Sequence, residues 1–112
     1  MIKQLAIVTR RPELSTEEFA RYWIDVHAPL AAAQGMRGYV INVRSAQQPK
    51  GALDHVDGVA EIWWDDHEHM HAGLSSEAGR IAAEDVANFA QRVSFVVVEP
   101  NVVVPVEPEE EL

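Results

Sequence analysis

The chain has 112 residues, of which 47% are apolar and 24% charged, and this size is typical of one compact domain. It contains no cysteine, which excludes disulfide scaffolds, cysteine nucleophiles, iron–sulfur clusters and thiolate zinc sites, and which fits the cytoplasmic location that we expect. Eighteen acidic residues against nine basic ones give a formal charge of -9, which disfavours nucleic acid and anionic membranes as partners.

The chain opens on a strand. Residues 2–9 are rich in Ile, Leu and Val, are apolar on both faces of a strand, and stop before Pro12. Their apolar centre, residues 5–8, is shorter than the roughly 7–15 residues of a signal-peptide core, so we interpret the segment as an uncleaved first strand. No apolar run approaches the ~20 residues that span a bilayer.

A helix is predicted to begin at Ser15, because Glu18 follows three residues later and the pair forms a capping box. Pro29 has no N–H for the carbonyl of Asp25 and crowds it, so we expect a kink or break at residues 27–28. Four apolar residues recur at helical spacing and predict one stripe that faces a sheet: Phe19, Trp23, Val26 and Leu30.

Asp65 and Asp66 can cap a mostly helical stretch that extends to Phe89, and Gly73, Ser75-Ser76 and Gly79 indicate a joint between two segments. Three further strands are indicated by β-branched or alternating runs: residues 39–44, 58–64 and 93–99. The order strand, helix, strand, strand, helix, strand is the split βαβ plan. The predicted fold class is therefore α+β and ferredoxin-like, a four-stranded antiparallel sheet with the helices on one face.

One domain is predicted over residues 1–106, followed by an acidic tail, residues 107–112, that we expect to be disordered. Helices on one face leave the other face of the sheet bare, and strands that are apolar on both sides require a partner there. A homodimer is the simplest solution. Its interior is predicted to include Asn42, with Arg44 and Glu61 paired, and residues 102–106 are a candidate edge strand for the partner.

The segment from His67 to His71 matches H-E-x-x-H, the zinc-protease helix motif. A third ligand is missing, because Gly73 breaks the longer pattern and the candidate carboxylates Glu84 and Asp85 fall on the next helical segment. We therefore expect a solvated helix face and no metal site.

His27 lies four residues after Trp23, on the flank of the predicted stripe and beside the predicted kink. Tyr39 opens the second strand on the side shared with Ile41, so that His27 and Tyr39 can meet at one end of a pocket. Each also has a purely structural interpretation, as a packed histidine and as a core tyrosine whose hydroxyl reaches the backbone.

The sequence resembles the EthD family of dimeric α+β barrels, over residues 2 to about 104. The resemblance rests on Phe19-x-x-Tyr22-Trp23-x-x-x-His27-Ala28-Pro29-Leu30, on Gly38-Tyr39, on residues 57–63, and on Phe89 ahead of Val97-Val98-Glu99. Similar proteins include methylmuconolactone isomerases and fungal polyketide decarboxylases.

The resemblance implies that two protomers pack sheet to sheet and that small organic molecules bind between sheet and helices. It makes His27 the family's helix histidine and Tyr39 the isomerases' strand tyrosine, and it places His55 near their loop histidine. Ile62 occupies the position of the isomerases' strand cysteine, which therefore has no counterpart in this chain.

These observations predict a cofactor-independent isomerase, lyase or cyclase that acts on a small aromatic, polyketide or lactone compound. His27 would act as general base or acid, Tyr39 would orient a substrate oxygen, and His55 is a second candidate proton carrier. Four apolar residues are expected to contact the substrate: Trp23, Ile41, Ile62 and Trp64. The alternatives are a protein that binds a hydrophobic pathway intermediate without transforming it, and a cofactor-free phenol oxygenase.

Overall fold

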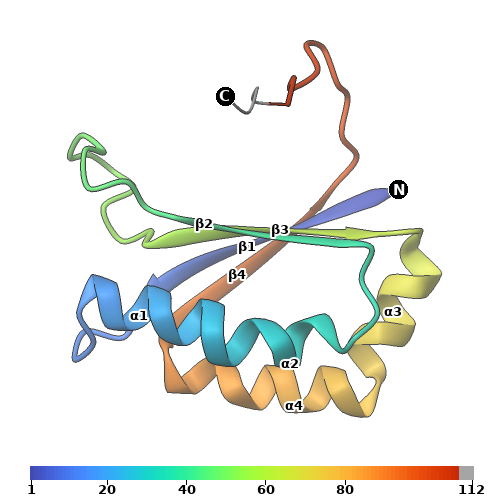
Figure 1. Ribbon diagram of the computed structural model, residues 1–112, viewed down its shortest axis with the longest axis horizontal. Coiled ribbons are helices and arrows are strands. Elements are labelled where there is room, and N and C mark those ends of the chain that lie inside the picture. Colours follow the sequence, from blue (N-terminus) through green and yellow to red (C-terminus); the bar gives the residue numbers. More distant parts are fainter. Residues whose placement is uncertain (109–112) are drawn as a thin grey trace.

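A computed structural model describes residues 1–108 of the protein. The elements, in chain order, are β1 (Ile2–Arg10), α1 (Thr16–Tyr22), a π-helical turn (Trp23–His27), α2 (Ala28–Ala32), β2 (Gly38–Val43), β3 (Gly58–Trp64), α3 (His67–Ser75), α4 (Glu77–Asp85), a 3-10 turn (Val86–Asn88) and β4 (Ala90–Val98). The strands form one antiparallel sheet in the order β2-β3-β1-β4, and the helices lie on one side of it (Figure 1). The predicted ferredoxin-like α+β fold is confirmed.

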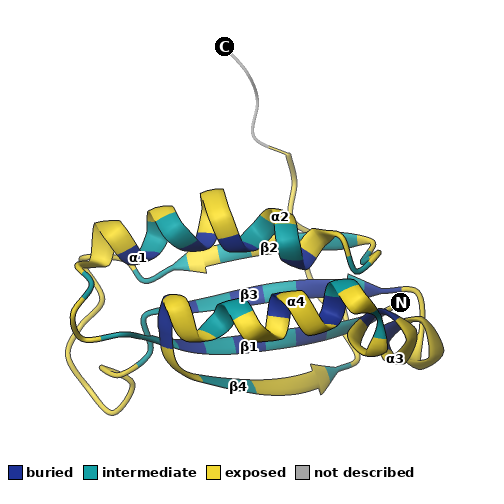
Figure 2. Cartoon of the chain, turned by 90° about the horizontal axis from the view of Figure 1, so that it is seen from below, coloured by how far each residue is buried: buried dark blue, intermediate teal, exposed yellow. Residues whose placement is uncertain are grey.

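The core lies between the helices and the inner face of the sheet. Alternate residues of β1 and β3 are buried there, and the register places Gln4 opposite Ile62 and Ala6 opposite Ala60. Figure 2, which looks onto the helical layer, shows these buried positions behind the helices, with β4 at the edge of the sheet beyond α4. The buried side chains form two clusters, one around Trp23 and Phe89 and one around Trp64.

The capping box is present: Ser15 accepts from the backbone N–H of Glu18, and the Glu18 carboxylate accepts from the backbone N–H of Ser15. The predicted apolar stripe is correct only in its first half. Val26 is 45% exposed, and the buried positions after Trp23 are His27 and Ala31 instead.

A π-helical turn explains this shift. The backbone N–H of Ala28 donates to the carbonyl of Trp23, five residues back, and the turn ends just before Pro29. Pro29 has no N–H to continue the α-helical ladder, so the helix accommodates one extra residue at this turn. Because of that residue, His27 rather than Val26 faces the sheet.

The second helical stretch divides at Ser76, as the sequence predicts. Asp66 caps α3 by accepting from the backbone N–H of His69, and Ser76 caps α4 by accepting from that of Gly79. Gly73 lets α3 approach Trp64 closely, since a Cβ at Gly73 would lie 2.6 Å from the indole ring. No helix among residues 1–108 has the length and apolar character needed to cross a membrane.

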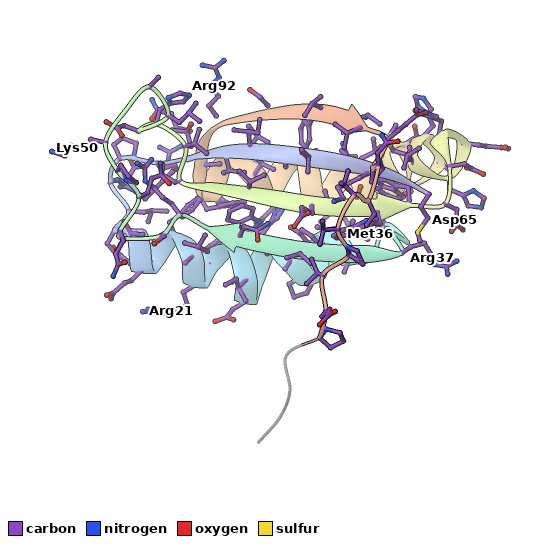
Figure 3. The ribbon with its side chains drawn as sticks, turned by 90° about the horizontal axis from the view of Figure 1, so that it is seen from above. Arg21, Met36, Arg37, Lys50, Asp65 and Arg92 are labelled. Carbon is purple, nitrogen blue, oxygen red and sulfur yellow. The ribbon has the colours of Figure 1, made fainter. Side chains whose placement is uncertain are left out.

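Figure 3 looks onto the open face of the sheet, with the helices behind it. Three side chains of this face form a small polar cluster. The Glu61 carboxylate accepts from Lys3 Nζ at 3.0 Å and from Asn42 Nδ2 at 3.1 Å. The predicted pairing of Arg44 with Glu61 is wrong. Arg44 lies just beyond β2, and its guanidinium donates to the carbonyls of Leu53 and Val56 and to the Asp54 carboxylate.

The segment after β4 leaves the sheet on the open-face side (Figure 1). Residues 102–106 are exposed and form no strand within this single chain. Of the predicted acidic tail, residues 109–112 lie outside the described residues.

Candidate active site

A cavity of about 350 Å³ lies between the helical layer and the inner face of the sheet, bordered by both core clusters. Its walls are mostly apolar, and its polar side chains are few: Gln4, Trp23, His27, Gln34, Tyr39 and Trp64. Three exposed wall residues, Leu74, Ala83 and Phe95, mark the side on which the cavity meets solvent, between α3–α4 and β4. Such a site suits a small, largely apolar organic molecule.

His27 is held on the cavity wall by Asp85, the last residue of α4. The His27 Nδ1 and Asp85 Oδ2 atoms are 3.0 Å apart, and the side chains are only 8% and 11% exposed. Asp85 Oδ1 accepts two further hydrogen bonds, from the Tyr22 hydroxyl at 2.6 Å and from Asn88 Nδ2 at 3.0 Å. Phe89 packs against the imidazole, with ring centroids 4.8 Å apart. The ring is therefore fixed in position.

This contact also fixes the tautomer of the neutral ring. Burial by itself would raise the pKa of the Asp85 carboxyl, but hydrogen bonds from Tyr22, Asn88 and His27 outweigh it, and the pKa lies below its ordinary value. The ionised carboxylate can only accept, so Nδ1 of His27 carries the proton and Nε2 carries a free lone pair. Within residues 1–108 Nε2 has no hydrogen-bond partner, and it is not sealed from solvent.

Tyr39 contributes a hydroxyl to the same cavity. Its oxygen accepts from Trp23 Nε1 at 3.2 Å, so the hydroxyl proton is free to be donated to a ligand. Burial raises the pKa of Tyr39, and the bond from Trp23 only partly offsets this effect. Tyr39 is therefore a neutral hydrogen-bond donor at physiological pH.

Five of the predicted site residues line this one cavity: Trp23, His27, Tyr39, Ile62 and Trp64. Ile41 does not line it, although it packs against the same core cluster as Tyr39. His55 does not either. It is exposed in the β2–β3 loop, which folds back on Arg44 rather than over the cavity.

Asp85 and Tyr22 are functional candidates that the sequence did not bring together with His27. From the sequence Asp85 is only a candidate metal ligand, because its actual partner His27 lies 58 positions away along the chain. One signal was available: an acidic residue at the C-terminal end of a helix opposes the helix dipole and calls for a compensating contact.

The histidine-rich segment lies on α3. His69 Nδ1 contacts the cap residue Asp66 at 2.7 Å, and both side chains are exposed. Within residues 1–108 there is no group of three or more His, Cys, Asp or Glu side chains that could hold a metal ion.

The EthD domain family matches residues 11–92, which is most of the chain and includes His27, Asp85 and Tyr39. The chain belongs to the EthD family. No curated protein matches this EthD chain at a significant level.

Solved structures share the fold of this EthD protein. An EthD family protein of Bacillus halodurans superposes with a TM-score of 0.72 at 23% identity, covering 90% of this chain and 100% of that one. A dimeric ferredoxin-like protein of Thermobifida fusca has a TM-score of 0.67 at 14% identity, covering 87% and 88%. A cofactor-independent oxygenase of Streptomyces nogalater has a TM-score of 0.67 at 14% identity, covering 93% and 96%.

Proposed function

We propose that this EthD protein catalyses cofactor-independent proton transfer on a small, largely apolar organic compound, as an isomerase, lyase or cyclase. The observation that carries the proposal is the His27–Asp85 pair at 3.0 Å, which holds the Nδ1 atom of a cavity-lining imidazole and leaves its Nε2 lone pair without a partner among the described residues. Nitrogen lone pairs of this kind are the commonest general bases in enzymes.

The proposed reaction begins with removal of a proton by Nε2 of His27 from a carbon next to a substrate carbonyl. The C–H electron pair forms a carbon–carbon double bond, and the carbonyl electron pair moves to oxygen, where the Tyr39 hydroxyl stabilises it by a hydrogen bond. The Asp85 carboxylate stabilises the imidazolium that results. In a substrate with a β,γ-double bond the enolate extends over that bond, and return of the proton from His27 to the γ-carbon moves the double bond into conjugation and completes an isomerisation.

The residues that line the cavity indicate the class of substrate. The Trp23 and Trp64 rings and Ile62 present flat apolar surface, and about 350 Å³ accommodates one or two fused rings. Aromatic, polyketide and lactone compounds carry the carbonyl or phenol that this chemistry needs. The substrate's own oxygen accepts the electron pair, so the proposed reaction requires no cofactor.

We propose further that the protein works as a homodimer that buries the open sheet face. That face carries apolar residues, among them Leu5, Ile7 and Val96, beside the Glu61 cluster. A contiguous apolar face of this kind marks an interface in most soluble proteins. The likeness to a dimeric ferredoxin-like protein supports the proposal.

Solvent exchange at an enolisable carbon tests the proposed chemistry without the natural substrate. The probe is 2-tetralone, an aromatic ketone that has acidic C–H bonds and fits the cavity. We expect the wild-type protein in D₂O to accelerate loss of its C1 proton signal, and His27→Ala to lower that acceleration by about 10²–10⁴-fold while remaining folded. Binding of 2-tetralone without accelerated exchange would support the alternative role of a binding protein. Equal exchange by the two proteins would contradict a role for His27.

A further inference from the structure

A buried amide on the cavity floor has no role in the proposed proton transfer. Gln4 is the third residue of β1, is only 5% exposed and lines the cavity. Its Oε1 accepts from Trp64 Nε1 at 3.1 Å, and this is its only side-chain hydrogen bond within residues 1–108. A buried amide group costs free energy unless its hydrogen-bonding capacity is used. Half of this amide is therefore available to a ligand.

Trp64 determines which half is available. An indole N–H can only donate, so the oxygen of Gln4 must face Trp64 and the NH₂ group must point the other way. The Gln4 Nε2 atom has no partner among the described residues but keeps some accessible surface, which agrees with its reaching the cavity. Gln4 therefore presents the N–H donors of its NH₂ group to the cavity.

The sheet register places Gln4 relative to the proposed reaction centre. Tyr39 on β2 and Gln4 on β1 are both opposite Ile62 on β3, so the three residues form one row across the inner face. Neighbouring strands lie about 4.8 Å apart, which puts the Tyr39 and Gln4 backbones roughly 10 Å apart. A ligand of one or two rings can reach both side chains at once.

We propose that Gln4 is a substrate-binding residue that selects compounds with a second oxygen acceptor, such as a ketone, ester or carboxylate. The acceptor would lie at the end of the molecule away from the oxygen held by Tyr39. This inference rests on the proposed function in one respect, that the substrate binds in the same cavity. If Gln4 serves Trp64 alone, its loss will change stability but not ligand preference.

Two probes of matched shape test this selection, 6-acetyl-2-naphthol and 6-isopropyl-2-naphthol, because only the acetyl group offers an acceptor. The readout is the ratio of their dissociation constants, measured by NMR titration. We expect Gln4→Met to reduce the relative preference for the acetyl probe by about two- to tenfold, the value of one neutral hydrogen bond. An unchanged ratio, or no binding of the acetyl probe to the wild-type protein at millimolar concentration, would overturn the proposal.

Two controls keep the test decisive. If Gln4→Met fails to fold because Trp64 Nε1 loses its acceptor, the double variant Gln4→Met/Trp64→Phe removes both partners and is compared with Trp64→Phe alone. The double variant must show the reduced ratio, and an unchanged ratio there would overturn the proposal. His27→Ala must keep the wild-type ratio, so failure of proton transfer and failure of acceptor selection are separate results.

Discussion

At the scale of single residues, the carboxylate of Asp85 decides which nitrogen of His27 can act on a ligand. Three donors converge on it, from Tyr22, His27 and Asn88, and each favours its ionised form. The carboxylate therefore positions the imidazole, keeps the proton on Nδ1 and stabilises positive charge on the ring. Removal of any one donor weakens a network rather than a single contact.

The lowered pKa of Asp85 predicts a pH-dependent contribution to stability. A carboxyl whose pKa is lower in the folded than in the unfolded protein stabilises the fold above its ordinary pKa and loses that contribution as the pH falls through the lowered value. We expect Asp85→Asn to lower the free energy of unfolding at pH 7, and the difference from wild type to shrink towards pH 3. Urea denaturation at a series of pH values measures this, and a constant difference would contradict it.

Tyr39 is predicted to contribute less than His27. Tyr39→Phe removes one hydrogen bond to the substrate oxygen and leaves the base in place. Because that oxygen becomes charged in the enolate, we expect exchange of 2-tetralone to slow by about 10- to 150-fold, corresponding to roughly 1.5–3 kcal/mol. A loss as large as that of His27→Ala would mean that Tyr39 itself transfers the proton.

At the scale of elements, the π-helical turn brings the site together. It rotates the helix beyond Trp23 by one position, so His27 and Ala31 face the sheet where an uninterrupted α-helix would present Val26 and Leu30. Turns of this kind recur at functional sites.

The sequence predicts the elements better than the contacts between them, for a physical reason. The Ser15 capping box, the Pro29 interruption and the Ser76 joint are local signals, and each is found where it was expected. Asp85 reaches His27 only because α4 packs beside α2, and Arg44 turns to its loop rather than to Glu61. Contacts between residues far apart in the chain depend on how the elements pack, and no local sequence pattern encodes that packing.

Pro29→Ala tests the role of the turn. Alanine supplies the missing N–H and removes the steric clash, so the helix can return to regular α geometry and carry His27 away from Asp85. We expect thermal stability to be kept or increased while exchange of 2-tetralone falls at least tenfold. Heteronuclear NMR of the His27 ring detects the proton on Nδ1 and so shows whether the variant has lost the contact with Asp85. Full exchange activity in a regular helix would show that the turn is dispensable.

At the scale of the whole molecule, the two faces of the sheet have different roles. The inner face carries the cavity, and the outer face carries apolar residues with a compact charged cluster at Glu61. The net charge of -9 opposes association at long range, so contact must come from local complementarity on this face.

The proposed homodimer predicts a clear response to a charge on the open face. Val96 lies on that face, opposite Leu5, and is 43% exposed in the single chain. We expect the wild-type protein to sediment as a dimer at micromolar concentration and Val96→Asp to sediment as a monomer. Val26→Asp is the matched control, since Val26 is 45% exposed on the helical side and should leave the dimer intact. A stable wild-type monomer would contradict the proposal.

The central claim is that His27, oriented by Asp85, acts as a base on a ligand in the cavity, and a crystal structure with bound 2-tetralone tests it most directly. The account predicts an enolisable carbon within about 3–3.5 Å of His27 Nε2, the ketone oxygen on the Tyr39 hydroxyl, and an intact Nδ1 contact to Asp85. A ligand bound outside this cavity, or bound within it with Nε2 turned to a protein group, would contradict the account.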